Sequence, residues 1–175
     1  MGLAIAFQAF CRSIDRVGES VSMDAFRVLI VCTANVCRSP AAQRFLQRSL
    51  LPYGAVVESA GTMAIDGNAA DETISRLMLE RGYDDIQQHR SRTLMPSHTH
   101  KYHLILCMEK EHLARVQSLN PSVLGRSKLM GHWDGQSEVD DPVGRSVSTY
   151  EKSLDKMEIL AQQWASKMRE MGFVS

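Results

Sequence analysis

Cys32 and Arg38 lie six positions apart, where a thiol and a guanidinium could act together on a phosphate group. The segment that contains them follows the apolar run Phe26–Val31, which is typical of a buried parallel strand. A helical pattern comes next, for which we expect Ser39 as the N-cap and Pro40 in the first helical position. Free backbone N–H groups and the helix dipole make a helix N-terminus a good anion site. The spacing therefore predicts a phosphate-binding loop with a nucleophile at its base.

The residue types in this loop suit such chemistry. A free thiol is mostly protonated near neutral pH, but converging loop amides, the helix N-terminus and Arg38 all favour the anion, so we expect Cys32 to be a thiolate. The planar guanidinium of Arg38 matches two phosphate oxygens and stays charged during phosphoryl transfer. Asn35 tolerates the left-handed backbone that a loop wrapping its amides inward needs.

The composition indicates one ordinary globular domain. A chain of 175 residues with 44% hydrophobic content has enough material for a full core. Lys+Arg equals Asp+Glu at 20 each and no basic run occurs, which argues against nucleic acid and anionic membranes as partners. The longest apolar stretches are too short to span a bilayer, so we expect no membrane insertion. The four cysteines suit a reducing compartment, which predicts a cytoplasmic protein.

Strand and helix patterns alternate along the chain. We expect strands at Phe26–Val31, Ala55–Ser59, Leu104–Met108 and Lys128–Met130, and helices at Ser39–Leu50, Ala70–Arg81, Glu111–Leu119 and Ser148–Met171. This alternation predicts an α/β fold of three layers: a doubly wound, four-stranded parallel sheet with helices on both faces. Ligands of such sheets bind at the carboxyl ends of the strands.

The chain resembles the low-molecular-weight protein tyrosine phosphatases, whose signature is a cysteine, five residues and Arg-Ser-Pro near the N-terminus. The resemblance begins at about Phe26 and covers several segments in the same order. These segments are Glu58–Thr62, His89–Arg92, Leu104–Glu109, Gly131–Asp134 and Asp140–Pro142. The last three resemble the bacterial branch that accompanies exopolysaccharide synthesis and its tyrosine kinases. The resemblance implies a flavodoxin-like fold.

The resemblance also implies a mechanism. Cys32 would attack phosphorus and carry a phosphocysteine intermediate, while Arg38 would bind the phosphate and stabilise the transition state. Asp141, directly before Pro142, would be the general acid, with the adjacent Asp140 as the alternative. The implied activity is hydrolysis of phosphotyrosine in proteins, with no cofactor and no metal. The implied partner is a phosphotyrosine protein, and a bacterial tyrosine kinase is a candidate.

The whole loop would bind phosphate, and residues outside it would support it. The loop residues implied by the resemblance are Thr33, Ala34, Asn35, Val36, Cys37, Arg38 and Ser39. In the family, serines and a histidine hold the loop asparagine in a strained conformation, and they correspond to Ser39, Ser59 and His89. Ser39 could also donate to the sulfur as it leaves. Cys37 could form a reversible protective disulfide with Cys32, or be a packed thiol.

The chain departs from the family pattern at four places. Ala34 stands where glycine usually precedes the loop asparagine, and a positive φ there would strain the loop. Val143–Gly144 stand where one or two tyrosines usually wall the mouth of the site, and His103 replaces an aspartate before the third strand. Residues 1–22 precede the usual start of the family. We therefore expect a phosphatase domain over 23–175 and an N-terminal extension that is loosely ordered or not translated.

Three other functions fit parts of the pattern. Arsenate reductases share this fold and loop, but would call for a downstream cysteine pair, and only Cys107 follows the loop. Protein arginine phosphatases tend to place threonine where Val36 stands, and an apolar residue there favours a flat aromatic ester. A non-catalytic phosphate-binding module is the alternative outside the enzymes. His98, His100 and His103 have no nearby cysteine or carboxylate at useful spacing, so we expect a polar, partly exposed turn there and not a metal site.

Overall fold

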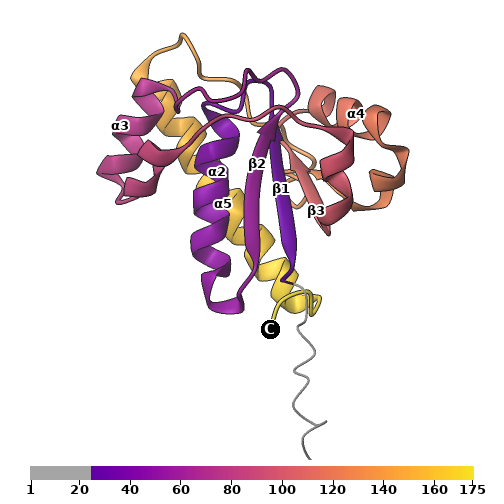
Figure 1. Ribbon diagram of the computed structural model, residues 1–175. Coiled ribbons are helices and arrows are strands. Elements are labelled where there is room, and N and C mark those ends of the chain that lie inside the picture. Colours follow the sequence, from indigo (N-terminus) through magenta and orange to yellow (C-terminus); the bar gives the residue numbers. More distant parts are fainter. Residues whose placement is uncertain (1–24) are drawn as a thin grey trace, which may run out of the picture.

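The computed structural model describes residues 25–175, and the extension predicted for 1–22 lies outside them. Four parallel strands form one sheet in the order β2-β1-β3-β4 (Figure 1). The strands are β1 (Arg27–Cys32), β2 (Val56–Gly61), β3 (Leu104–Cys107) and β4 (Ser127–Leu129). The α-helices are α2 (Arg38–Leu50), α3 (Glu72–Glu80), α4 (Lys110–Leu119) and α5 (Val147–Glu170). Short 3-10 helices lie at Leu51–Tyr53, Asp84–Gln88, Pro96–Lys101 and Pro121–Arg126.

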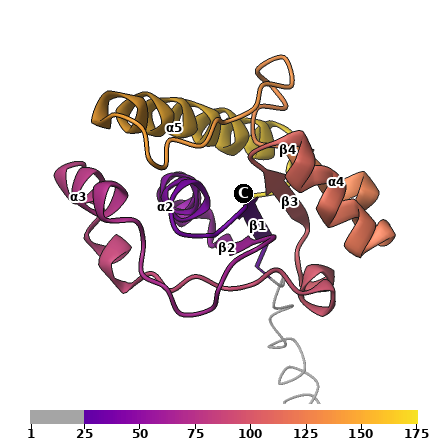
Figure 2. The same cartoon turned by 90° about the horizontal axis from the view of Figure 1, so that it is seen from above.

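The sheet lies between two layers of helices, as the alternation predicts. Figure 2 shows α2 and α5 on one face of the sheet and α4 on the other. Strand β1 is buried on both sides: Val28 and Ile30 face the cluster that includes α2 and α5, while Leu29 and Val31 face the cluster that includes α4. Such two-sided burial explains why the strand reads as a continuous apolar run and not as an alternating one.

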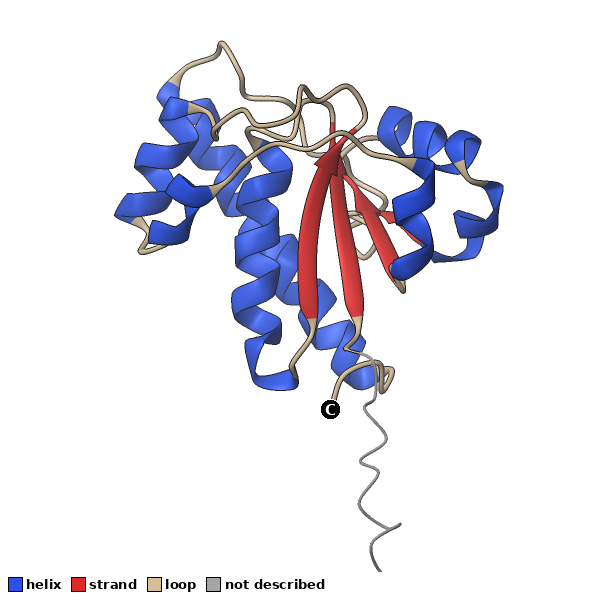
Figure 3. Cartoon of the chain, viewed as in Figure 1, coloured by secondary structure: helices blue, strands red, loops and turns tan. Residues whose placement is uncertain are grey.

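The strand order places a crevice at the carboxyl ends of β1 and β3. From β1 the chain crosses to β2 on one side, and it then returns past β1 to form β3 on the other side. The connections that follow β1 and β3 therefore diverge, and ligands of doubly wound sheets bind at this point. Figure 3 shows loops gathered over these strand ends.

The predicted strands and α-helices are all present within a few residues of their expected limits, but the start of α2 differs. The helix begins at Arg38, with Cys37 as N-cap and no side-chain cap, so the prediction of Ser39 as N-cap and Pro40 in the first helical position was wrong. The Ser39 hydroxyl contacts the Cys32 sulfur and the Asn35 amide at 2.9 Å each and does not cap the helix.

The histidines before β3 lie in an exposed turn, as expected. His98 and His100 are exposed in the 3-10 helix Pro96–Lys101. His103, which replaces the family's aspartate, accepts the backbone N–H of Arg27 on Nδ1 at 2.9 Å. His103 therefore supplies a hydrogen-bond acceptor at the start of β1.

Within residues 25–175, the helices are all too short or too polar to cross a bilayer.

Candidate active site

The predicted phosphate loop connects the end of β1 to the start of α2. Cys32 is the last residue of β1 and is 2% exposed. Its sulfur lies 2.9 Å from the Ser39 hydroxyl, which can donate to a thiolate. The loop is fixed to the segment after β2, because Thr62 N donates to Cys32 O and Met63 N to Thr33 O, both at 2.9 Å. The nucleophile predicted from sequence therefore lies at the base of a braced loop.

Asn35 organises the loop from within. It is fully buried and has a left-handed φ of 56°, which confirms the expected conformation. Its side-chain N–H groups donate to the Ser39 and Ser59 hydroxyls at 2.9 Å each. Its side-chain oxygen accepts the Arg92 backbone N–H at 2.9 Å. Ala34 has no positive φ, so the missing glycine leaves no left-handed alanine in the loop.

His89 braces the loop from outside. Its Nε2 lies 2.6 Å from the Asn35 carbonyl oxygen, so this nitrogen carries the proton and donates. Burial lowers the pKa of His89, and the arginines Arg44, Arg90 and Arg92 lower it further, whereas the bond to Asn35 opposes the shift. His89 therefore favours a neutral ring in the folded protein.

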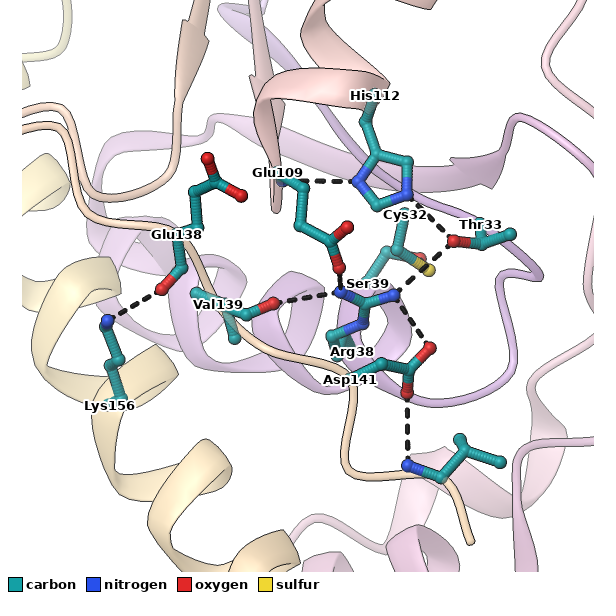
Figure 4. A network of polar contacts seen from close by, with 11 residues as sticks. Cys32, Thr33, Arg38, Ser39, Glu109, His112, Glu138, Val139, Asp141 and Lys156 are labelled. Atoms are coloured by element: carbon teal, nitrogen blue, oxygen red, sulfur yellow. Dashed lines mark hydrogen bonds and ion pairs between the residues drawn. The ribbon is translucent and has the colours of Figure 1, made fainter.

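Arg38 is a buried cation surrounded by acceptors. Its side chain is 2% exposed, and Nη1 contacts the Glu109 carboxylate and, at 2.9 Å, the Val139 carbonyl. Nη2 donates to Asp141 at 2.8 Å and lies 3.4 Å from the Thr33 hydroxyl (Figure 4). Burial opposes its charge, but the bond to Glu109 and neighbouring anions outweigh burial and raise the pKa of Arg38.

The Nε of Arg38 is buried without a hydrogen-bond acceptor among residues 25–175. Buried donors are nearly always satisfied in proteins, so an orphaned one needs an explanation. An oxyanion held in the loop would supply the missing acceptor.

The acid segment brings Asp141 to this guanidinium from more than 100 residues away in the chain. Asp141 Oδ2 accepts from Arg38, and Oδ1 accepts the Val143 backbone N–H at 3.1 Å. Its side chain is 46% exposed, so this carboxylate lies at the solvent side of the Arg38 guanidinium. Of the acidic pair, Asp141 and not Asp140 makes the contact with Arg38.

The other described cysteines are free, buried thiols. Cys37 is 3% exposed, and burial, together with the charges of Asp141 and Cys32, raises the pKa of its thiol. Cys107 is fully buried in β3, where burial also raises its thiol pKa. Cys107 therefore has no access to relay a disulfide. A protective bond between Cys32 and Cys37 stays a prediction.

Sequence reasoning gave no role to Glu109 and His112. Glu109 is the N-cap of α4 and pairs with Arg38, while the His112 ring contacts the Thr33 hydroxyl at 2.8 Å. Their position in the chain could have indicated a role in the site, because both residues follow the carboxyl end of β3, which forms one side of the expected crevice. Across residues 25–175, no three His, Cys, Asp or Glu side chains are grouped as metal ligands would be.

Gly61 allows the phosphate loop to pack against β2. A Cβ atom on Gly61 would lie 2.4 Å from Thr33 O and 2.9 Å from Asn35 N. These are backbone atoms of the loop, so a side chain at this position would displace the loop itself. The glycine is needed for the close approach and not for an unusual φ.

Comparison with known families gives a match over nearly all of the described chain. The model of the family "Low molecular weight phosphotyrosine protein phosphatase" matches residues 27–172. The low molecular weight protein-tyrosine-phosphatase Etp of Escherichia coli K12 is 37% identical over 141 residues, covering 81% of this chain and 93% of Etp.

Solved structures agree with this match. Wzb of Vibrio vulnificus, in complex with benzylphosphonate, has a TM-score of 0.77 at 32% identity and covers 81% of this chain and 98% of that structure. The YwlE arginine phosphatase of Geobacillus stearothermophilus has a TM-score of 0.78 at 28% identity and covers 85% of this chain and 96% of that structure.

Proposed function

Because the chain belongs to the low molecular weight phosphotyrosine protein phosphatase family, we propose that it hydrolyses phosphotyrosine in proteins through a phosphocysteine intermediate on Cys32. The contact between Arg38 and Asp141 carries this proposal. It places a carboxyl group at the guanidinium that belongs to the same loop as the thiol. This arrangement supports Cys32 as nucleophile, Arg38 as the phosphate-binding cation and Asp141 as acid in one site.

In the first step the Cys32 thiolate attacks phosphorus, and the bond between phosphorus and the tyrosine oxygen breaks. In this step Asp141 is protonated and no longer paired with Arg38, whose guanidinium binds the phosphate, and it gives its proton to the departing phenolate oxygen, so tyrosine leaves neutral. Arg38 and the loop amides hold the non-bridging oxygens, on which charge must be stabilised in the transition state. The burial of Arg38 strengthens this interaction because water does not screen it.

In the second step water attacks the phosphocysteine. The Asp141 carboxylate takes a proton from this water, and the sulfur–phosphorus bond breaks to release inorganic phosphate. The sulfur leaves as a thiolate, and the Ser39 hydroxyl at 2.9 Å donates to it. The hydrogen bonds of Asn35 to Ser39 and Ser59 keep the loop in its phosphate-binding shape throughout.

We infer from the apolar residue Val36 that the loop favours an aryl ester over a phosphoguanidinium. Val36 is a half-buried apolar residue in the loop and packs against the main core. Val143 is half exposed after the acid, and Gly144 follows it, so no tyrosine stacks there on a substrate ring. The similarity to an arginine phosphatase at 28% identity makes phosphoarginine the competing substrate.

We infer that a phosphotyrosine protein is the partner. The segments Leu104–Glu109, Gly131–Asp134 and Asp140–Pro142 support a tyrosine kinase of polysaccharide synthesis or export as that partner, because they resemble the family branch that accompanies such kinases. The requirement for a free thiolate supports a reducing compartment, hence the cytoplasm.

The decisive experiment gives one purified sample phosphotyrosine, phosphoarginine and arsenate, with no added metal. We expect phosphotyrosine and p-nitrophenyl phosphate to be hydrolysed, and Cys32→Ser to abolish turnover while still binding vanadate. Faster hydrolysis of phosphoarginine than of phosphotyrosine would show that phosphoarginine is the preferred substrate. Full activity in Cys32→Ser would discard the mechanism.

A further inference from the structure

A partly buried contact between His112 and Thr33 lies beside the site and has no part in the mechanism above. His112 is 3% exposed in the first turn of α4, and its Nε2 lies 2.8 Å from the Thr33 hydroxyl oxygen. Thr33 directly follows Cys32. Figure 4 shows the Thr33 hydroxyl turned toward both the His112 ring and the Arg38 guanidinium. The contact therefore joins α4 to the phosphate loop.

The partners of the His112 ring determine which nitrogen carries the proton. Nδ1 lies 3.2 Å from the backbone nitrogen of Glu109. Because an N–H group can only donate, Nδ1 must be the acceptor and is unprotonated. A neutral imidazole has a single N–H, so Nε2 carries the proton and donates to Thr33.

The neutral form is the one that this geometry accommodates. A protonated ring would direct an Nδ1 proton at the Glu109 backbone N–H. Burial lowers the pKa of His112, and the charge of Arg38 lowers it too, whereas the carboxylates of Glu109, Glu111 and Asp141 oppose the shift. The ring thus remains a donor to Thr33 at neutral pH.

The Thr33 hydroxyl is left with one proton to donate. Its oxygen accepts from His112 Nε2 and also lies 3.4 Å from Arg38 Nη2, so both lone pairs face donors. No acceptor within residues 25–175 takes the hydroxyl proton. Nη2 of Arg38 also contacts Asp141, so the hydroxyl lies where the guanidinium and the acid meet.

The first turn of α4 supplies the anchor for both groups. The Glu109 side chain accepts the backbone N–H of His112, and the His112 ring accepts the backbone N–H of Glu109, which forms a reciprocal capping box. The same Glu109 carboxylate contacts Arg38. One rigid helix end therefore positions the guanidinium through Glu109 and the hydroxyl through His112.

We propose that the Thr33 hydroxyl is an additional donor to the bound phosphoryl group, and that His112 is the positioning residue that directs its proton there. This inference rests on the proposed function, because the acceptor is a non-bridging oxygen of a phosphate ester or of an oxyanion such as vanadate. The contact adds to the loop amides and Arg38, and it does not involve the leaving oxygen.

Matched variants test both halves of the proposal. Thr33→Val removes the hydroxyl at similar volume, and Thr33→Ser retains it. His112→Asn keeps an acceptor for the Glu109 N–H but cannot reach Thr33. We expect Thr33→Val to weaken both kcat/KM and vanadate inhibition roughly 10-fold to 100-fold, the range for a hydrogen bond to a charged group. Thr33→Ser should stay near wild type.

The effects of the substitutions at Thr33 and His112 should also be coupled. We expect His112→Asn to resemble Thr33→Val, and the double variant to be no worse than either alone. The loss should be equal for phenyl phosphate and p-nitrophenyl phosphate, since the contact is to non-bridging oxygens. Multiplying effects in the double variant would show that His112 only caps α4, which would overturn its role. Thermal melts report whether His112→Asn folds, and Thr33→Val tests the hydroxyl without it.

A separate measurement distinguishes failure of this inference from failure of the proposed function. Vanadate protection of Cys32 from iodoacetamide reports oxyanion binding without turnover. If wild type hydrolyses no phosphomonoester, the proposed function fails. In that case, weaker vanadate protection of Cys32 in Thr33→Val than in wild type would still support the hydroxyl contact. Equal protection in the two proteins overturns the contact. A wild type that vanadate leaves unprotected overturns both proposals.

Discussion

Replacing Asn35 by alanine and by glycine separates two contributions to the phosphate loop. Either change removes three side-chain hydrogen bonds, to Ser39, to Ser59 and from Arg92 N. At about 1 kcal/mol of net stability each, their loss lowers the free energy of unfolding by roughly 3 kcal/mol. The backbone at this position has φ 56°. That conformation costs alanine a further ~1–2 kcal/mol but costs glycine little.

Glycine also increases the entropy of the unfolded chain, which offsets ~0.4–1 kcal/mol of its advantage. We therefore expect Asn35→Gly to be more stable than Asn35→Ala by about 1 kcal/mol, with both well below wild type. Urea unfolding with linear extrapolation measures the three values. Both variants should lower kcat on p-nitrophenyl phosphate by on the order of 10²-fold, because the loop no longer holds its geometry.

A matched control lies outside the site. Gln136 is exposed and has φ 64°, so Gln136→Gly should leave activity unchanged. If Asn35→Ala proves as stable as Asn35→Gly, the left-handed backbone is not a source of strain. If Asn35→Ala is as stable as wild type, the buried network does not stabilise the loop, and the reasoning is refuted.

Three other predictions concern single residues. Asp141→Asn should lower kcat ~10²–10⁴-fold for phenyl phosphate and much less for p-nitrophenyl phosphate, and equal losses in a leaving-group series would contradict its role as acid. Gly61→Ala should weaken vanadate inhibition and lower the melting temperature, because the Cβ of the new alanine would lie 2.4 Å from Thr33 O. Wild-type values of both quantities would refute the close approach of the loop to β2. Burial lowers the pKa of His89, so its contribution to the free energy of unfolding should be complete above the ordinary histidine pKa of about 6.5 and should be lost as the pH falls below it. In urea unfolding between about pH 7 and 5, His89→Gln should therefore flatten the decline of the free energy of unfolding with falling pH. An unchanged decline would argue against a neutral buried ring.

The sheet and the phosphate loop could be predicted because their signals are local. From Val28 to Val31 every residue is apolar, which is typical of a strand buried on both faces, and β1 is such a strand. The last helix also carries apolar residues at helical spacing, a local signal for a helix with one buried face, and Tyr150, Leu154, Met157, Ala161, Trp164 and Met168 are all buried. Periodicity and turn residues are therefore enough to predict the sheet and the crevice at the carboxyl ends of its strands.

The features that the sequence did not reveal depend on contacts that form only in the folded chain. Ser39 reads as an N-cap, but its hydroxyl contacts Cys32 and Asn35, and the helix begins two residues earlier than such a cap predicts. Glu109 and His112 read as the ordinary start of a helix. Their contacts cross 71 and 79 positions of sequence to Arg38 and Thr33, and no local pattern encodes such pairs.

Trapping the covalent intermediate tests the central claim most directly. The protein is mixed with p-nitrophenyl phosphate, quenched within a turnover and digested, and the peptide that contains Cys32 is examined by mass spectrometry. We predict a gain of one phosphoryl group on Cys32 in wild type, a larger trapped fraction in Asp141→Asn with this good leaving group, and none in Cys32→Ser. Turnover with the phosphoryl group on any other residue, or with no phosphoenzyme on Cys32, would contradict the account.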